Sequence, residues 1–556
     1  MAPLPPTRRQ KVVRRLPRRV RHYWKLLVAC VAFVGVLAVV LGTVSVRPYV
    51  TSASDEGADA VTQNVAGTKD LFDAGVAHSI QLSFTQAAYD KMLDQYFQDG
   101  EKEYVEADLT IDGTRLPSVG IRLKGNSTLG GLTRDGKAAT RGPGGFGGEN
   151  RPGRDAQPPG GGFPQNGQLP EGFTPPDGAQ QPGAAQPGQQ QPGAAQPGQQ
   201  PGGGFGRTAL KAEEPEKLPW LIRVDEFVEG RRYQGHRDLA VRVSGMGGGT
   251  TVLNEAVSLQ VLAAAGEVAQ KYAYTSFTVN DRPTTARLVV EHPDENFADQ
   301  MDGTGVLYKS LATGRFTDQG DDQTDYQDDF QQITKKGSQD LQPVIDLIRW
   351  VTTSSDKEFD AKLDEHVDVE SFARYLAVQN LLLNFDDMSG PGRNYYLWYD
   401  LSTKKFSVVG WDYNLTMSGD GTSGPHDSVS MGFGGDRPQG QQQGAQQPPA
   451  GMQLPEGVEM PGGNGGPGGL GGGHTLKERF LASAAFDEVY ETAYRELYTK
   501  IYGSGSALSA VKNIVAVLRT VDGGDSGTLA SESSQLEDLI TRRTSSLAQD
   551  EVITQR

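Results

Sequence analysis

Two tracts built almost entirely from Gly, Pro and Gln place the strongest constraint on how this chain can fold. The first runs from about residue 133 to 207 and repeats the sequence QPGAAQPGQQ at 181–190 and 191–200, and the second covers 421–474. Such tracts bury too little apolar area to offset their chain entropy, so both are predicted to be disordered insertions. Since the entropy of closing a loop grows only logarithmically with its length, a folded domain can tolerate them.

The amino terminus predicts a membrane anchor. Residues 26–46 form a run of 21 uncharged, mostly apolar residues, and residues 1–25 contain nine basic side chains and no acidic one. A helix of this length spans a hydrocarbon core of ~30 Å, and the preceding positive charge keeps the amino terminus in the cytoplasm. A cleaved signal peptide is the alternative, but its apolar stretch is normally only ~7–15 residues long. We therefore expect a single-pass protein of the cell membrane with its main domain outside the cell.

Charge and cysteine content exclude several classes of function. The chain of 556 residues has a net charge of −16, and most of its dense basic sequence lies in the first 25 residues. Nucleic acid is therefore an improbable partner, because phosphate backbones bind to basic stripes. The single cysteine, Cys30, excludes disulfides and Cys-ligated metal sites within the chain. The seven histidines show no zinc spacing, and no nucleophile-elbow motif is present.

The remaining sequence predicts an α+β fold. Alternating apolar residues indicate strands at 80–84, 105–111, 119–123, 218–227, 239–243, 272–279, 285–290, 306–308, 395–399 and 406–411. Helical spacing indicates helices at 87–97, 254–265, 341–352, 359–366 and 369–383, with further amphipathic helices over 475–556. The order is thus rich in strands first and in helices later.

Polar residues gather where three of these elements begin or end. Asp386 and Asp387 follow an apolar helix, Asn394 opens a strand, and Asp412 follows the next strand. Carboxylate and amide oxygens at such points can hold Mg²⁺ or Mn²⁺ against phosphate oxygens. The alternative interpretation is solvation of a helix end by Asp386 and Asp387 and a turn cap by Asp412.

A second candidate is the segment 120–128, GIRLKGNST. Its strand pattern places Arg122 and Lys124 on one face, just before a turn that contains Asn126. Positive side chains beside free backbone N–H groups can hold phosphates. The alternative is an ordinary exposed strand that ends in a turn.

These motifs together resemble the CotH kinase family, named for a bacterial spore-coat protein and similar to atypical kinases of the secretory pathway. The resemblance runs through 76–129, with IDG at 111–113 and VGIRLKGNST at 119–128, and continues with KLPW at 217–220, VDEFV at 224–228 and YQG at 233–235. It extends through NEA at 254–256, LYK at 307–309 and the block 367–415, which carries NFD at 384–386, NYYL at 394–397 and WDYN at 411–414. This last block is the most specific part.

The resemblance implies an atypical, two-lobed protein-kinase-like domain that uses ATP with Mg²⁺ or Mn²⁺. Asp386 would be the catalytic-loop aspartate, and Asp412 with Asn394, and Asp386 beside them, would hold the metal, in the order found in ordinary kinases. The residues implied to bind the nucleotide are Lys124, Arg122, Asn126 and Glu255. The implied reaction is transfer of the γ-phosphate of ATP to Ser or Thr of an extracytoplasmic surface or coat protein.

This sequence also departs from the family pattern at three places. Leu221 stands where the family usually has a basic residue, Asn254 stands where it has an arginine, and Arg242 lies in a strand end that is usually rich in asparagine. If these changes remove nucleotide binding, the protein would be a catalytically degenerate scaffold or adhesion protein of the cell envelope. If they do not, Lys124 or Arg242 would contact the phosphates.

The expected organisation follows from these observations. In chain order we expect a basic cytoplasmic tail (1–25), a transmembrane helix (26–46), a stalk (47–75), the first part of an N-terminal lobe (76–132), the first insertion (133–207), the rest of that lobe (208–315), a C-terminal lobe with the catalytic-type loop (316–420), the second insertion (421–474) and the helical end of the C-terminal lobe (475–556).

Overall fold

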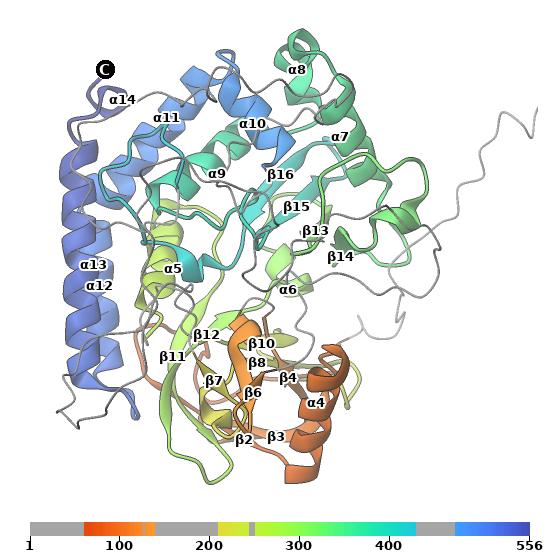
Figure 1. Cartoon of the computed structure of the whole chain (residues 1–556), viewed down its shortest axis with the longest axis vertical. Coiled ribbons are helices and arrows are strands. Elements are labelled where there is room, and N and C mark those ends of the chain that lie inside the picture. Colours follow the sequence, from red (N-terminus) through yellow and green to blue (C-terminus); the bar gives the residue numbers. More distant parts are fainter. Residues whose placement is uncertain (1–60, 126–127, 139–208, 244–250, 430–472, 556) are drawn as a thin grey trace, which may run out of the picture.

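The computed structural model describes residues 61–125, 128–138, 209–243, 251–429 and 473–555 (Figure 1). The predicted cytoplasmic tail, the predicted transmembrane helix, Asn126 and nearly all of the two predicted insertions lie outside the described residues. Among the described helices, none alone has the length and apolar character to cross a membrane. A bent pair, Asp487–Gly503 with Ser506–Leu518, meets that test only when the two are taken together.

Seven strands close into a barrel, which we call the barrel lobe and which lies at the bottom of Figure 1. Their order around the barrel is β10 (Asp238–Val241), β12 (Thr285–Glu291), β11 (Tyr272–Val279), β2 (His78–Ser83), β3 (Val105–Ile111), β4 (Thr114–Leu123) and β8 (Trp220–Arg223). All neighbours are antiparallel except β11 and β2. The closed sheet leaves no free edge within these seven strands.

Strand β2 shows how apolar side chains fill the barrel. In β2, every second residue is buried, so Ile80 and Leu82 lie in the barrel core while Ser79 and Gln81 are exposed. Helix α4 (Gln86–Asp99) packs on the barrel with a buried face that includes Tyr89, Met92 and Tyr96, which belong to the same hydrophobic cluster as the barrel core. The helix begins at Thr85, whose side chain accepts from Ala88 N, and ends at Gly100 in a left-handed conformation.

A mainly helical part, which we call the helical lobe, lies above the barrel in Figure 1. At its base is a four-stranded sheet in the order β14 (Phe330–Gln332), β13 (Gly305–Ser310), β15 (Tyr395–Asp400) and β16 (Phe406–Gly410). Its helices are α7 (Gln342–Thr353), α8 (Asp356–Lys362), α9 (Val369–Leu381), α10 (Thr475–Ala482), α11 (Asp487–Tyr498), α12 (Ser506–Leu518), α13 (Ser526–Leu547) and α14 (Glu551–Thr554).

Helix α5 (Leu253–Ala265) joins the two lobes. Ten of its residues are buried, on all sides of the helix, as expected for a helix that crosses a core. It follows barrel strand β10 in the sequence and packs against α12, which belongs to the helical lobe. Residues of α5, α9 and α11 share one hydrophobic core, separate from the core inside the barrel.

Short elements complete the described chain. These are β1 (Gln63–Val65), β5 (Leu132–Arg134), β6 (Lys137–Ala138), β7 (Leu210–Lys211), β9 (Arg231–Tyr233), α6 (Glu295–Ala298), η1 (Thr128–Gly131), η2 (Pro215–Lys217), η3 (Gln323–Tyr326), η4 (Leu363–Glu365), η5 (Tyr413–Leu415) and η6 (Thr499–Gly503). Strand β7 pairs with β5 in parallel, so the chain returns from residues 139–208 beside the point where it left.

Two of the expected boundaries differ from the structure. Residues 61–75, predicted as the end of a stalk, pack on the barrel, because β1 pairs with β9 and Leu71 is fully buried in the barrel core. Residues 133–138, predicted as the start of the insertion, form strands β5 and β6. Residues 133–138 contain a single apolar residue, and the pairings of β1 with β9 and of β5 with β7 join residues more than 70 positions apart.

Candidate functional site

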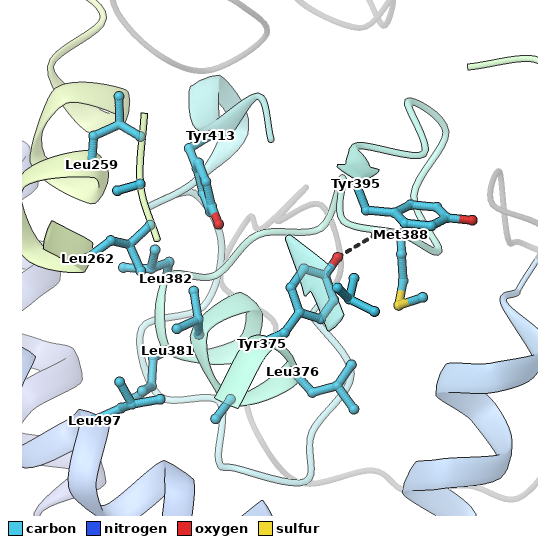
Figure 2. Close-up of a cluster of buried hydrophobic side chains, with 14 of the residues drawn as sticks. Leu259, Leu262, Tyr375, Leu376, Leu381, Leu382, Met388, Tyr395, Tyr413 and Leu497 are labelled. Atoms are coloured by element: carbon cyan, nitrogen blue, oxygen red, sulfur yellow. Dashed lines mark hydrogen bonds between the residues drawn. The ribbon is translucent and has the colours of Figure 1, made fainter. Parts of the chain in front are cut away.

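The loop that follows α9 holds Asp386 in a fixed position. Asp386 is 6 % exposed, and its two carboxylate oxygens accept hydrogen bonds from Gly392 N (2.5 Å) and from the Asn394 side chain (3.0 Å). The backbone N–H of Met388 donates to the hydroxyl of Tyr375 on α9 at 3.2 Å, as Figure 2 shows. The hydrophobic cluster beneath the loop is thus connected to it by a buried hydrogen bond.

Two glycines permit the close approach of this loop to Asp386. A Cβ atom at Gly392 would lie 2.7 Å from an oxygen of Asp386, and one at Gly390 would lie 2.4 Å from its Cα. Neither position has room for a side chain. The sequence SGPG at 389–392 therefore serves the geometry of the carboxylate directly.

Asn394 connects Asp386 to the strand end that carries Asp412. Its side-chain amide donates to both the carboxylate and the backbone carbonyl of Asp386, each at 3.0 Å. Its own carbonyl accepts from Trp411 N at 3.3 Å. The turn after Asp412 is in turn fixed by Asn254 on α5, whose amide donates to the carbonyls of Asn414 (2.7 Å) and Thr416 (3.0 Å).

Three residues around the site have left-handed backbone conformations without being glycine. These are Leu383 (φ 52°), Arg393 (φ 47°) and Asp412 (φ 59°). Such residues cost of order 1–3 kcal/mol each and persist only where the surrounding structure holds them. Backbone strain of this kind concentrates at functional sites, and here it occurs on both sides of Asp386 and at Asp412 itself.

Burial raises the pKa of Asp386 to about 7, and the negative charges of Asp412 and Asp387 add to this effect against the hydrogen bond from Gly392. A carboxyl with a pKa near neutrality can accept a proton at physiological pH. Asp387 lies beside it, 2 % exposed, and is paired with Lys477 on α10.

Asp412 lies against an arginine from the barrel lobe. Arg242, one residue beyond β10, makes two hydrogen bonds to Glu255 on α5, at 2.8 and 2.7 Å, and a further one to Asp412. Burial opposes ionisation of Asp412, but the charges of Arg242 and Lys124 outweigh it and hold the pKa of Asp412 below its usual value. The two carboxylates and the guanidinium therefore form one ionic cluster, in which Arg242 and Glu255 are buried and the side chain of Asp412 is 22 % exposed.

Two lysines reach the same place from different lobes. Lys124, directly after β4, lies 5.1 Å from the centre of the Trp411 ring, and Lys309 on β13 lies 5.8 Å from it. Burial lowers the pKa of Lys124 to about 7 and that of Lys309 to about 8, with neighbouring arginines adding to both effects. Within the described residues neither ammonium group makes a hydrogen bond or a salt bridge. An anionic ligand would supply hydrogen-bond acceptors to both ammonium groups.

Two further groups line the region around the lysines. Arg122 lies over the ring of Tyr104 at 5.2 Å. The imidazole of His292, just after β12, meets Trp411 edge to face at 5.3 Å, and its Nδ1 has no hydrogen-bond partner among the described residues. Burial, together with the charge of Lys309, keeps the pKa of His292 well below its usual value, so the ring is neutral.

The structure therefore brings together most of the site residues predicted from the sequence. Asn394 is hydrogen-bonded to Asp386 through its side chain and to Trp411, the residue before Asp412, through its backbone carbonyl. Arg242 links Glu255 to Asp412, and Lys124 lies against Trp411. Arg122 shares the face of β4 with Lys124 but packs on Tyr104. Asn126 lies outside the described residues.

The donor set for a metal ion is partly engaged elsewhere. Asp386, Asn394 and Asp412 offer the oxygen ligands that Mg²⁺ and Mn²⁺ prefer. Among the described residues, however, no group of three or more His, Cys, Asp or Glu is positioned to hold a metal ion. One oxygen of Asp412 is occupied by Arg242 and both oxygens of Asp386 by N–H donors. The ligand atoms of these residues suit a divalent cation, provided that the bond between Arg242 and Asp412 is broken.

Sequence reasoning gave no role to several groups that shape the site. Lys309 comes from the LYK segment, Gly390 and Gly392 from the catalytic-type loop, and Lys477 follows the second predicted insertion. The glycines gave a signal, because two of them flank Pro391 directly after paired aspartates. The sequence gave no signal for Lys477, because its partner Asp387 lies 90 residues earlier.

A separate cavity of about 800 Å³ lies elsewhere in the molecule. It is lined by residues of α5, α9, β15 and β16, among them Leu262, Val378, Trp398 and Val409. Neither Asp386, Asp412 nor the two lysines line it. It is therefore distinct from the site described above.

Comparison with protein families agrees with this geometry. A model described as CotH kinase protein matches residues 203–516, which is more than half of the chain. The chain belongs to the CotH kinase family. The match covers Arg242, Glu255, Lys309, Asp386, Asn394 and Asp412, whereas Arg122 and Lys124 precede it. Comparison with curated proteins gives no match.

Proposed function

We propose that this CotH kinase family protein is a membrane-anchored, extracytoplasmic protein kinase that transfers the γ-phosphoryl group of ATP to Ser or Thr residues of surface or coat proteins. One observation carries the proposal. Two lysines whose ammonium groups make no hydrogen bond or salt bridge within the described residues converge on Trp411. Trp411 directly precedes Asp412, and its backbone N–H donates to Asn394, which is hydrogen-bonded to Asp386. Kinases need cations for the phosphates and acids for metal and proton transfer, and both occur here side by side.

The chain order of these groups supports the proposal. A strand-end cation, Arg242, pairs with Glu255 on the following helix, and Asp386, Asn394 and Asp412 come later in that order. Protein kinases place a strand cation, a helix glutamate, a catalytic aspartate, an asparagine and a metal-binding aspartate in this sequence. The roles follow by correspondence of position and chemistry.

In this proposal each residue has a stated role. Lys124, Lys309 and Arg242 bind the phosphate oxygens of ATP, and Glu255 orients Arg242. Asp412 and Asn394, with Asp386 beside them, would hold Mg²⁺ or Mn²⁺, which when bound neutralises charge on the phosphates. Asp386 accepts the proton of the Ser or Thr hydroxyl while the new O–P bond forms and the bond to ADP breaks. A base with a pKa of about 7 suits that step.

The experiment that tests the kinase function is transfer of labelled phosphate. The Asp412→Ala variant should lose the transfer of phosphate from labelled ATP to protein in the presence of Mn²⁺ or Mg²⁺. The control is Asp420→Ala, which removes an exposed carboxylate eight residues later and should leave the transfer unchanged. Unchanged labelling by Asp412→Ala would rule out the assignment.

A second function is favoured by one specific contact. Asp412, the residue proposed to bind metal, is paired with Arg242 instead. This arrangement also fits a catalytically degenerate member of the family that acts as a scaffold or adhesion protein of the envelope. Thermal unfolding with ATP and Mn²⁺ separates the two, because a ligand at ~100 times its Kd adds ~2.7 kcal/mol of stability. The absence of any shift would favour the scaffold.

The location is part of the proposal and rests on the sequence at residues 1–46. A protease added to intact cells should digest the folded domain and leave a fragment that contains the basic segment 1–25. Protection of the folded domain would contradict an extracytoplasmic position.

A further inference from the structure

Arg242 lies between the carboxylates of Glu255 and Asp412, and the proposed nucleotide site needs Asp412 to bind a metal ion. Its Nε and Nη2 atoms bind Glu255, and Nη2 also binds Asp412. The side chains of Arg242 and Glu255 are 5 % and 2 % exposed, so water contributes little to either charge. The backbone carbonyl of Arg242 accepts from Arg287 Nε at 2.9 Å, which fixes the strand end that carries the guanidinium.

The guanidinium thus supplies Asp412 with a full positive charge in the absence of any ligand. Arginine stays protonated at all physiological pH values, so this charge cannot be removed by titration. Lys124 and Lys309 surround the same carboxylate and add positive potential. A divalent cation that approaches alone therefore meets three cations and an acid that is already paired.

A polyphosphate changes this balance. Its oxygens would draw Arg242, Lys124 and Lys309 towards themselves, because each is attracted more strongly to a multiply charged anion than to one carboxylate. Arg242 would keep its two bonds to Glu255, made by Nε and one N–H of Nη2, and only the bond from Nη2 to Asp412 would be given up to the phosphates. Asp412 would then be free to take a metal ion together with the phosphates.

We propose that Arg242 occupies the divalent-cation position on Asp412 in the free protein, so that the metal binds only together with a polyphosphate ligand. This inference rests on the proposed nucleotide site and adds an order of binding to it. The protein then does not hold Mn²⁺ or Mg²⁺ by itself, even where the free ion is abundant. The ion–nucleotide complex is the species that the site selects.

The test measures binding of Mn²⁺ alone, without ATP, by the loss of the free-ion signal in electron paramagnetic resonance. Wild-type protein should bind Mn²⁺ weakly. The Arg242→Gln variant should bind it at least about tenfold more tightly, within the usual range of coupling between sites. Arg122→Gln removes one positive charge from the same cleft without touching Asp412, and should change the affinity by less than about threefold. With a non-hydrolysable ATP analogue present, the wild-type protein should also retain Mn²⁺.

Each outcome decides a separate point. If wild-type protein binds Mn²⁺ alone as tightly as Arg242→Gln does, the order of binding is overturned and the kinase function is untouched. If neither protein retains Mn²⁺ even with the ATP analogue, the proposed function fails, and this inference with it. Far-UV circular dichroism checks folding. Should Arg242→Gln not fold, Arg242→Lys replaces it, because lysine keeps a charge for Glu255 but is too short to bridge both acids. A gain in Mn²⁺ affinity by Arg242→Lys supports the proposal. An unchanged Mn²⁺ affinity overturns it.

Discussion

The acids of the candidate site and its two lysines, Lys124 and Lys309, differ in how the protein holds them before any ligand binds. Asp386 accepts two hydrogen bonds, Asp387 is paired with Lys477, and Asp412 is paired with Arg242. The ammonium groups of Lys124 and Lys309 make neither hydrogen bonds nor salt bridges within the described residues, and the rings of Trp411 and Tyr396 lie against them. The acids are thus preorganised by the protein, whereas the lysines are arranged for a partner from outside.

This difference shows how a site can combine precision with affinity. Groups that act on the reacting atoms gain from a fixed position, because misplacement lowers the rate. Groups that bind a ligand gain from being left unsatisfied, because the ligand then supplies the missing interaction. The stability of the free protein is lower as a result, and binding recovers it.

The largest expected effect comes from the catalytic side. Asp386→Asn should lower phosphate transfer by about 10²–10⁴-fold, the usual contribution of a general base. Binding of ATP, measured by the shift in melting temperature, should remain, since the lysines are unchanged. Asp400→Asn, the same substitution on β15 away from the site, is the control. If Asp386→Asn also abolished the ATP shift, the two sides of the cleft would not be separable.

A second prediction concerns the support beneath the catalytic-type loop. Arg543 on α13 is fully buried and donates to the carbonyls of Leu381 and Asn380, both at 2.7 Å, and to that of Ser423 at 3.0 Å. Arg543→Leu leaves these acceptors unsatisfied, at about 1–3 kcal/mol each, so we expect a loss of about 3 kcal/mol or more in unfolding free energy. Chemical denaturation measures it.

The neighbouring Arg542→Leu is a matched control, because Arg542 is exposed on the same helix. It should change the unfolding free energy by less than about 0.5 kcal/mol. Equal effects of the two substitutions would mean that the carbonyl contacts of Arg543 contribute nothing to the end of α9.

The third prediction tests the two lysines, whose ammonium groups have no hydrogen-bond partner within the described residues. Lys124→Met should raise the melting temperature of the ligand-free protein, because it removes an ammonium group that is buried beside Arg242 and makes no hydrogen bond or salt bridge within the described residues. It should also abolish most of the stabilisation by ATP, which is ~2.7 kcal/mol at ~100 times Kd for an intact site. Lys91→Met on the exposed face of α4 should do neither. A lower melting temperature for Lys124→Met would show that Lys124 is a structural partner of Asp412.

The smallest effect is a dependence of ATP affinity on pH. The pKa of free Lys124 is about 7 and that of free Lys309 about 8, lowered chiefly by burial, so both lose protons as the pH rises from 7 to 9. Phosphates require the charged form, so binding takes up protons and affinity falls with rising pH, by at most about tenfold per pH unit for each lysine. Titration calorimetry at pH 6.5 and 8.5 would measure it. An affinity that rises with pH would contradict this assignment.

The unfolding free energy of the ligand-free protein should change with pH in the opposite direction, rising where the affinity for ATP falls. A lysine with a folded pKa of about 7 and an unfolded value near 10.5 destabilises the fold fully below pH 7. As the pH rises from about 7 towards 10.5, the unfolded chain holds more protons than the folded one, so the contribution of Lys124 becomes less unfavourable.

Local pattern was sufficient to predict the regular elements and the acids of the site. Strands 105–111 and 272–279 have the predicted bounds, and helix α5 begins one residue before the predicted 254. Asp386, Asn394 and Asp412 were found because each stands where an element starts or stops, which sequence periodicity reveals. The family resemblance supplied their grouping.

Contacts between distant parts of the chain were beyond this reasoning. The pairing of β1 with β9 joins residues about 168 apart, and the contact of Arg242 with Asp412 joins residues 170 apart. No periodicity encodes either, because each depends on how the lobes pack. The sequence could mark Arg242 as unusual, yet its neutralisation of Asp412 is a property of the folded molecule alone.

The bond between Arg543 and the end of α9 has a consequence for biosynthesis. Every residue of the cleft is made before Arg543 leaves the ribosome, yet the carbonyls next to the catalytic-type loop lack their guanidinium until α13 arrives. Domains form during synthesis in the order in which their segments emerge, at ~5–20 residues per second. A nascent chain can therefore complete its barrel while the loop that carries Asp386 is still unsupported, and that support is complete only in the final stage of translation.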